Sequence, residues 1–216
     1  MARPVLHGYT FSVYAWIARL VLVEKGVGFE WREVDPFDCP DDAPLLQLNP
    51  FCRVPVLEHD GSVLYETAAI AQYIDERFDG PRLMPCDAIE RARMRQIICL
   101  VDSDAYWPLV RQVFVQSFRQ PRTGSLPDQS ALDQGRAAAE HVLGVFETLA
   151  VGKIWLVGQR PGLADFHLAP MMSYFAEVDA GRAMLARHPQ LSAWWSSITK
   201  TASFLATQPD LAGRSK

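Results

Sequence analysis

The spacing of apolar and polar residues follows two different patterns along the chain, and the pattern changes near residue 80. Before that point, short strands and helices take turns. Apolar and polar side chains alternate over residues 29–32, and the stretch over 29–34 is predicted to be a half-buried strand. Residues 14–25 carry apolar side chains at helical spacing and stop at Gly26, which predicts a helix. The other elements predicted here are a strand over 4–9, a hairpin over 54–65 and a helix over 67–78.

After a break at residues 79–82, the apolar spacing is helical and no strand is predicted. Pro108 is expected to kink or end the first of these helices. Further helices are predicted over 129–150, over 163–175 and within 191–205. The pattern predicts a small α/β domain over residues 1–79, a linker over 80–88 and an all-helical domain over 89–216.

The composition fits a folded globular protein and excludes a disordered chain, a coiled coil and a collagen-like fibre. The 216 residues are 49% hydrophobic and 21% charged. No apolar run approaches the ~20 residues that a membrane-spanning helix needs. The start of the chain lacks the apolar stretch of a signal peptide. We therefore expect a soluble, cytoplasmic protein with no membrane partner.

The chain carries a net charge of −4, and its charged residues are distributed unevenly along the sequence. Residues 1–80 hold 6 basic and 13 acidic side chains, whereas the rest of the chain holds 15 basic and 12 acidic ones. This change of sign supports two units with different surfaces. Nucleic-acid binders carry basic patches, and the sequence indicates none, so no nucleic-acid partner is expected.

The cysteines form no Cys-x-x-Cys pair, which argues against a dithiol redox motif and against a zinc site. They are Cys39, Cys52, Cys86 and Cys99. Because they are scattered singly, we expect four reduced thiols and no bound metal. Cys99 stands in an apolar stretch and is expected in the core.

The first candidate for chemistry is Ser12, at the point where the first predicted strand gives way to a helix. A serine at this position is a natural N-cap, and most cap serines only cap. A hydroxyl there also lies beside free backbone N–H groups and the positive end of the helix. It can donate a hydrogen bond to an anion such as a thiolate.

The second candidate is the Val54-Pro55 pair inside a predicted strand. Proline removes a donor from a strand ladder, and a cis bond resolves the conflict. Such a bond turns the backbone N–H and C=O of Val54 outward, where they can pair with a peptide-like ligand. Only ~5–6% of X–Pro bonds are cis, so the sequence alone does not establish this geometry.

The third candidate is Glu66-Thr67, which opens the helix after the hairpin. The N–H and hydroxyl of Thr67 can hold a ligand carboxylate at the helix N-terminus. The Glu66 carboxylate can hold a ligand ammonium nearby. Together they suit an α-amino acid head group, although an acid in the first turn of a helix is also common without any ligand.

The order and spacing of these three pieces resemble the glutathione S-transferase superfamily over nearly the whole chain. The matching residues of the first domain are Asn49-Pro50-x-x-Arg53-Val54-Pro55-x-Leu57 and Leu64-x-Glu66-Thr67-x-Ala69-Ile70-x-x-Tyr73-Ile74. Those of the second domain are Gly158-x-x-Pro161-Gly162-Leu163-Ala164-Asp165 and His188-Pro189-x-Leu191-x-x-Trp194. Both domains therefore support the same resemblance.

The resemblance implies a thioredoxin-like α/β domain that binds glutathione and an all-α helical-bundle domain that holds a small electrophile. Glutathione would rest its cysteinyl backbone on Val54, beside Pro55. Its γ-glutamyl end would meet Glu66 and Thr67. Glutathione would be a co-substrate, no metal would be needed, and the chain would form a homodimer.

In the serine-type members, which are theta-, zeta- and tau-like, a serine donates a hydrogen bond to the glutathione thiolate. Counting back from Glu24-Lys25-Gly26 places Ser12 there. Tyr9 is the rival, because tyrosine-type members put a tyrosine at the end of the first strand, and Tyr14 is a weaker third. The side chains expected to line an acceptor pocket are Phe11, Tyr14, Tyr106 and Trp107.

Two stretches depart from the family's pattern. Some members hold the glycyl carboxylate with a Lys, His or Gln, but the loop over 35–42 offers only acids. Arg53 is the remaining candidate for that role, together with Gln47. Cys52 stands where the family often has glycine. It is either a tolerated small residue or a thiol that forms a mixed disulfide with glutathione.

Three functions are therefore weighed. The first is a glutathione transferase, with glutathione-dependent isomerisation, dehalogenation or peroxide reduction possible at the same site. The second is a non-catalytic module that binds a protein partner, which the acidic loop favours. The third is a thiol oxidoreductase using Cys52, which the lack of a Cys-x-x-Cys disfavours. The intact Val54-Pro55 and Glu66-Thr67 pieces favour the transferase.

Overall fold

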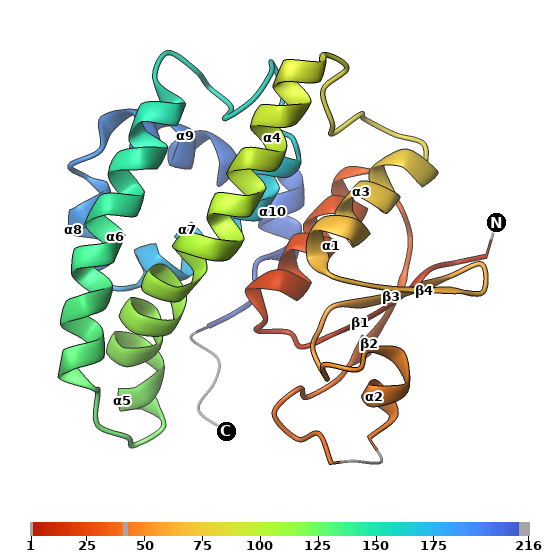
Figure 1. Ribbon diagram of the computed structural model, residues 1–216, viewed down its shortest axis with the longest axis horizontal. Coiled ribbons are helices and arrows are strands. Elements are labelled where there is room, and N and C mark those ends of the chain that lie inside the picture. The colour runs from red at the N-terminus through yellow and green to blue at the C-terminus, as the bar shows by residue number, and fades with distance from the viewer. Residues whose placement is uncertain (1, 41–42, 212–216) are drawn as a thin grey trace. The chain divides into compact units, whose positions relative to one another are not determined.

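Two compact units make up the chain, and the computed structural model describes residues 2–40 and 43–211. The first unit holds the residues up to Leu83 together with the segment that starts at Ala202. The second unit runs from Met84 to Thr201. The first unit is α/β, and every described element of the second is a helix, as the fold class predicted (Figure 1).

The first unit is built on a four-stranded mixed sheet in the order β2-β1-β3-β4. The central strand β1 pairs parallel with β2 and antiparallel with β3, so that Leu6 lies between Trp31 and Leu57. The elements of this unit are β1 (Val5–Gly8), α1 (Val13–Glu24), β2 (Glu30–Glu33), α2 (Pro44–Leu48), β3 (Val56–His59), β4 (Ser62–Tyr65), α3 (Thr67–Arg77) and α10 (Ala202–Thr207).

Helix α1 packs against the sheet at the end of β1, and Gly8 permits the close approach. A Cβ on Gly8 would lie 2.3 Å from the Trp31 ring and 3.0 Å from the Ala15 side chain. These distances are too short for a methyl group. The start of α1 is thereby held against the end of β1.

The predicted hairpin is confirmed. Strands β3 and β4 are antiparallel, with His59 opposite Ser62. Asp60 and Gly61 form the turn with positive φ angles of 47° and 76°. That pair of angles is typical of the two-residue turn that joins twisted strands.

A buried ion pair ties the end of α1 to α3. The Lys25 ammonium lies 3.1 Å from the Asp75 carboxylate and donates to the backbone carbonyls of Asp75 and Pro81 as well. The same carboxylate accepts the N–H of Leu83 at 2.8 Å. Because all three ammonium protons have acceptors, the cost of burying the charge is offset.

The second unit is a set of helices, and none of the helices described in the chain is long and apolar enough to cross a bilayer. Its elements are α4 (Ala88–Leu100), the π-helices η1 (Val101–Ala105) and η2 (Trp107–Arg119), α5 (Gln120–Arg122), α6 (Gln129–Ala150), α7 (Leu163–Glu177), α8 (Asp179–Leu185) and α9 (Pro189–Ile198). Cys99 is exposed on α4, so its predicted place in the core is wrong. The apolar positions around it, Ile97 and Ile98, take the buried face instead.

Pro108 does not end the helix that contains it. The chain stays helical from α4 through η1 and Tyr106 into η2, so Pro108 lies inside a continuous helix, near the start of its second π-helical part. The wider turn of a π-helix changes the hydrogen-bond register around Tyr106, between η1 and η2. A change in register, rather than a break, accommodates the proline.

The last predicted helix is two helices in the structure, α9 and α10, and α10 belongs with the first unit. Trp16 of α1 is fully buried and donates its indole N–H to the Thr207 hydroxyl at 2.8 Å. Its ring also packs against Phe204, with the ring centroids 5.1 Å apart. The C-terminal segment therefore completes the core of the α/β unit.

Two buried ionisable groups stand near the start of α7. Asp165 accepts hydrogen bonds from Leu156 N, Gly162 N and Trp194 Nε1 at 2.8–2.9 Å. Burial raises its pKa to about 6, and these hydrogen bonds hold the pKa down against that effect. The Asp165 carboxylate therefore joins the start of α7 to Trp194.

His167 is fully buried one turn into α7. Burial lowers its pKa to about 4, and the hydrogen bond between Nδ1 and the Leu163 carbonyl works in the opposite direction. Its Nε2 has no partner among the described residues. The neutral imidazole is therefore the form that the fold accommodates.

We predict that Lys25→Met lowers the free energy of unfolding by about 3–5 kcal/mol, because it leaves the Asp75 carboxylate buried without its cation. Arg136→Met is the matched control, since Arg136 and Asp133 form an exposed pair on α6. The control is expected to change the free energy by less than about 1 kcal/mol. Urea unfolding measures both. Equal losses in the two variants would contradict the prediction.

We also predict that His167 destabilises the fold in acid. Its folded pKa of about 4 lies below the ordinary value of 6.5, so the unfolded chain takes the proton first as the pH is lowered. The stability of the fold therefore decreases as the pH falls from about 6.5 to about 4. Asp165 acts in the opposite direction between about 6 and 3.8, because its folded form takes the proton first. The two effects offset each other in the wild type.

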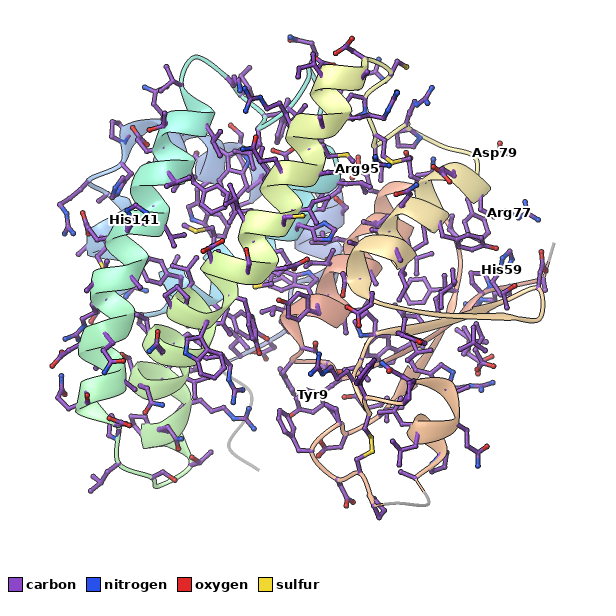
Figure 2. All side chains as sticks on the ribbon, viewed as in Figure 1. Tyr9, His59, Arg77, Asp79, Arg95 and His141 are labelled. Carbon is purple, nitrogen blue, oxygen red and sulfur yellow. A yellow bond between two sulfur atoms is a disulfide. The ribbon has the colours of Figure 1, made fainter. Side chains whose placement is uncertain are left out.

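Replacing only the histidine exposes its contribution. His167→Asn keeps a donor for the Leu163 carbonyl and is expected to gain about 2 kcal/mol of stability relative to wild type between pH 7.5 and pH 4.5. His141→Asn, on the exposed face of α6 (Figure 2), is the control and should show no such relative gain. Urea unfolding at the two pH values measures the difference, and a flat difference for His167→Asn refutes the prediction.

Candidate functional site

The candidate site starts at the turn between β1 and α1. Ser12 is the N-cap of α1: its N–H donates to the Tyr9 carbonyl at 2.8 Å and its Oγ accepts the Ala15 N–H at 3.2 Å. The predicted capping role is confirmed. The hydroxyl proton of Ser12 has no acceptor among the described residues, so this half-buried group keeps a free donor at the positive end of a helix.

Strand β2 holds this turn in place. The Glu33 carboxylate accepts the backbone N–H of Thr10 at 2.8 Å, the Thr10 hydroxyl at 2.6 Å and the Trp31 indole N–H at 2.9 Å. Arg19 donates to the Thr10 carbonyl at 3.3 Å and lies over the Trp31 ring. We call Thr10, Arg19, Trp31 and Glu33 the turn clamp.

The turn clamp is not predicted from the sequence. The two-residue period of a strand was the available signal, because it places Trp31 and Glu33 on the same face of the predicted strand. It did not reveal that Thr10 lies across from them. That proximity follows from the parallel pairing of Gly8 with Glu33.

Tyr9, the rival to Ser12, lies at the end of β1 (Figure 2). It is half-buried, and its ring meets Phe11 at 5.6 Å and Phe37 at 5.9 Å in edge-on contacts. Phe37 comes from the loop over 35–42, whose charged side chains are all acids. This aromatic cluster adjoins the turn that carries Ser12.

The segment before β3 is organised by Asn49, which is buried. Its side-chain amide donates to the Arg53 carbonyl at 2.9 Å and accepts the Phe51 N–H at 3.0 Å, and its own carbonyl accepts the Cys52 N–H. The Val54–Pro55 bond is cis. The sequence alone left both the cis and the trans geometry open. Val54 is half-buried, and none of the loop hydrogen bonds between described residues uses its backbone.

Arg53 is exposed, and its guanidinium lies over the Phe51 ring at 5.6 Å. It is the single Lys or Arg between residues 33 and 76. Gln47 is exposed on α2. The structure thus leaves Arg53 as a cation that an anionic ligand of this unit can reach.

Helix α3 begins without a side-chain cap. Glu66, the residue before it, is exposed and has φ +71° and ψ 115°, while Thr67 is buried at the first helical position. A non-glycine residue in the left-handed region costs about 1 kcal/mol or more, and such residues cluster at functional sites. An uncapped helix start beside a carboxylate is an arrangement that suits a zwitterionic head group.

Cys39 and Cys52 form a disulfide, with their Cα atoms 6.5 Å apart, which corrects the expectation of four reduced thiols. Their separation of 13 residues is not a recognisable redox spacing, so only the fold brings them together. Cys86 and Cys99 are free and exposed. Cys52 adopts φ +50°, a backbone conformation that favours glycine.

The predicted acceptor residues belong to both units. Phe11 and Tyr14 are half-buried in the first unit. In the second, Tyr106 is half-buried, and Trp107 is 58% exposed with Arg111 over its ring. Their assignment to an acceptor pocket stays a prediction. No cluster of side chains suited to a metal ion occurs among residues 2–40 and 43–211.

We predict that the turn clamp keeps the Ser12 turn rigid. Glu33→Ala removes three hydrogen-bond acceptors and is expected to raise amide hydrogen exchange at least about tenfold at residues 10–12. Glu30→Ala, an exposed residue of the same strand that pairs with Arg32, is the matched control. Unchanged exchange in Glu33→Ala, or equal acceleration in both variants, contradicts the prediction.

Comparison with known proteins gives the family. The glutathione S-transferase N-terminal domain model matches residues 11–77, and the glutathione S-transferase C-terminal domain model matches residues 104–201. A probable glutathione S-transferase GSTU6 of Oryza sativa subsp. japonica is 32% identical over 97% of this chain and 89% of its own length. A maleylacetoacetate isomerase of Pseudomonas aeruginosa is 30% identical over 94% and 92%.

The fold agrees with the sequence matches. The structure of glutathione S-transferase III in its apo form superposes with a TM-score of 0.85, at 28% identity, over 95% of each chain. The predicted fold class, a thioredoxin-like domain with a helical domain after it, is therefore confirmed. With two family models, these relatives and the shared fold in agreement, the chain belongs to the glutathione S-transferase family, whose members are enzymes that act on glutathione.

Proposed function

We propose that the chain is a serine-type glutathione transferase in which the Ser12 hydroxyl hydrogen-bonds the glutathione thiolate. One observation carries the proposal: the Ser12 oxygen accepts the Ala15 N–H, while its proton has no acceptor among the described residues. The hydroxyl is therefore oriented by the helix and still has a hydrogen bond to give. Its place at the N-terminus of α1 adds the favourable end of the helix dipole.

The remaining ligand contacts are proposed from the same unit. Glutathione is a modified tripeptide, and the unused backbone of Val54 before Pro55 suits its cysteinyl portion. The uncapped start of α3, with Glu66 and Thr67, suits the γ-glutamyl head group, because it offers N–H donors beside a carboxylate. Arg53 is the proposed partner of the glycyl carboxylate.

The chemistry requires a thiolate near neutral pH. A free thiol has a pKa of about 8.5, and lowering it by about two units requires about 3 kcal/mol of preferential stabilisation of the thiolate. A hydroxyl hydrogen bond to an anion contributes about 1.5–3 kcal/mol, and the helix N-terminus contributes up to about 1–2 kcal/mol. The two together suffice. Ser12 neither attacks nor accepts a proton; the thiolate attacks the electrophile.

The second candidate function is a glutathione-dependent isomerisation. The relative from Pseudomonas aeruginosa, at 30% identity, carries the name maleylacetoacetate isomerase. An activated thiolate can add to a conjugated double bond, allow rotation about the resulting single bond and leave again. The same Ser12 geometry serves both reactions, so the electrophile decides between them. The predicted homodimer and cytoplasmic location stay predictions.

The proposal predicts that Ser12 variants raise the pKa of bound glutathione by about one to two units. Ser12→Gly is the informative change, because glycine costs only a few tenths of a kcal/mol as an N-cap, whereas alanine costs about 1 kcal/mol. The thiolate absorbance of the protein saturated with glutathione, followed against pH, measures the shift. Ser12→Thr keeps a hydroxyl and is expected to restore most of the effect.

Tyr9→Phe is the matched control and should leave the bound thiol's pKa unchanged. If Tyr9→Phe raises that pKa and Ser12→Gly does not, the tyrosine is the donor and the serine-type assignment is wrong. Calorimetry with glutathione checks occupancy for each variant. Absence of binding at millimolar glutathione would refute the transferase and leave the protein-binding module in its place.

A further inference from the structure

The disulfide between Cys39 and Cys52 has no part in the proposed conjugation. We propose that these two cysteines are a redox-active pair that exchanges with glutathione and gives the chain a second activity, the reduction of small disulfides. The inference rests on the proposed glutathione site of the first unit. It concerns different residues from those that activate the thiol for conjugation.

The position of Cys52 links the pair to that site. Cys52 lies two residues before Val54, in the loop that the buried Asn49 holds through hydrogen bonds to the backbones of Phe51, Cys52 and Arg53. A ligand paired with the backbone of Val54 therefore lies on the same short, ordered loop as the Cys52 sulfur.

The position of Cys39 links the pair to the other side of the site. Its loop also carries Phe37, which contacts the Tyr9 ring at 5.9 Å, and the Tyr9 carbonyl accepts the Ser12 N–H. Figure 2 shows the disulfide as a yellow bond in the α/β unit. It joins the loop that leads to Val54 with the loop that packs on the Ser12 turn.

The two cysteines are open to exchange. Both are half-buried rather than enclosed, and both lie in loops rather than in the sheet or its helices. Cys52 also has φ +50°, so a glycine would meet less strain there. Non-glycine residues in this conformation cluster at functional sites, which supports a use for the Cys52 sulfur.

The charges next to the pair make its two sulfurs unequal. Arg53 follows Cys52, and Asp38 precedes Cys39. A cation favours a thiolate and an anion opposes it, so Cys52 is the better leaving group. The incoming glutathione thiolate therefore attacks the sulfur of Cys39.

The proposed steps balance as thiol–disulfide exchange. One glutathione thiolate bonds to the Cys39 sulfur while the bond to Cys52 breaks, which leaves Cys52 as a thiolate. A second glutathione thiolate attacks the glutathione sulfur of this mixed disulfide, which releases oxidised glutathione and the Cys39 thiolate. The dithiol then reduces a small disulfide by two further exchanges and closes again. In total, two glutathione molecules are oxidised and one disulfide becomes two thiols.

The first test counts thiols in the intact 216-residue chain. Titration with a thiol reagent under denaturing conditions is expected to find two reactive thiols, Cys86 and Cys99, after equilibration with oxidised glutathione. After equilibration with excess reduced glutathione, it is expected to find all four. Cys52→Ser exposed to oxidised glutathione should gain one glutathione on Cys39, seen by peptide mass spectrometry. Four free thiols under both conditions would overturn the proposal.

The second test measures turnover with hydroxyethyl disulfide and glutathione, coupled to glutathione reductase. Cys39→Ser and Cys52→Ser are each expected to lower the enzymatic rate at least about tenfold. Cys86→Ser, which removes an exposed free cysteine, is the matched control and should keep the wild-type rate. Glycine adopts the left-handed backbone of residue 52 readily, so Cys52→Gly removes the sulfur and preserves the shape of the loop. This variant should lose the disulfide-reducing activity as well.

The outcomes also separate this inference from the proposed transferase. The Cys39 and Cys52 variants should bind glutathione in a calorimeter and keep the Ser12-dependent pKa of the bound thiol. Glutathione binding together with full disulfide reduction in Cys39→Ser overturns the redox pair alone. Failure of the wild type to bind glutathione overturns both proposals.

Discussion

The first unit depends on how closely α1 approaches the end of β1. Gly8 is the condition for this contact, because any side chain there would overlap the Trp31 ring and Ala15. The contact places the N-terminus of α1, with Ser12 as its cap, directly after the central strand of the sheet. The position of the free Ser12 hydroxyl thus depends on Gly8, which has no side chain to hold α1 away from β1.

Local patterns were enough to predict the parts of the site that depend on nearby residues. The N-cap at Ser12, the hairpin at Asp60-Gly61 and the start of α3 at Thr67 each follow from residues within a few positions. The fold class followed from the change in apolar spacing near residue 80. The spacing of the glutathione-site motif then pointed to the family, which the comparisons confirmed.

Features that depend on distant residues were not predicted. The disulfide joins two cysteines whose spacing carries no signal, and Glu33 reaches Thr10 only because β1 and β2 pair in parallel. Pro108 was expected to kink or end an α-helix, but the chain around it is a π-helix. The different hydrogen-bond register of a π-helix accommodates the proline. In each case the deciding contact was tertiary, or the local geometry was an uncommon one.

The place of α10 has a consequence for how the protein is made. Trp16 of α1 packs against Phe204 and donates a hydrogen bond to Thr207, and both partners belong to α10. During synthesis the N-terminal segment leaves the ribosome long before those partners are made, so its core stays incomplete until the chain has grown past residue 207. The α/β unit begins before the helical unit along the chain, but it can reach its final packing only after the helical unit has been synthesised.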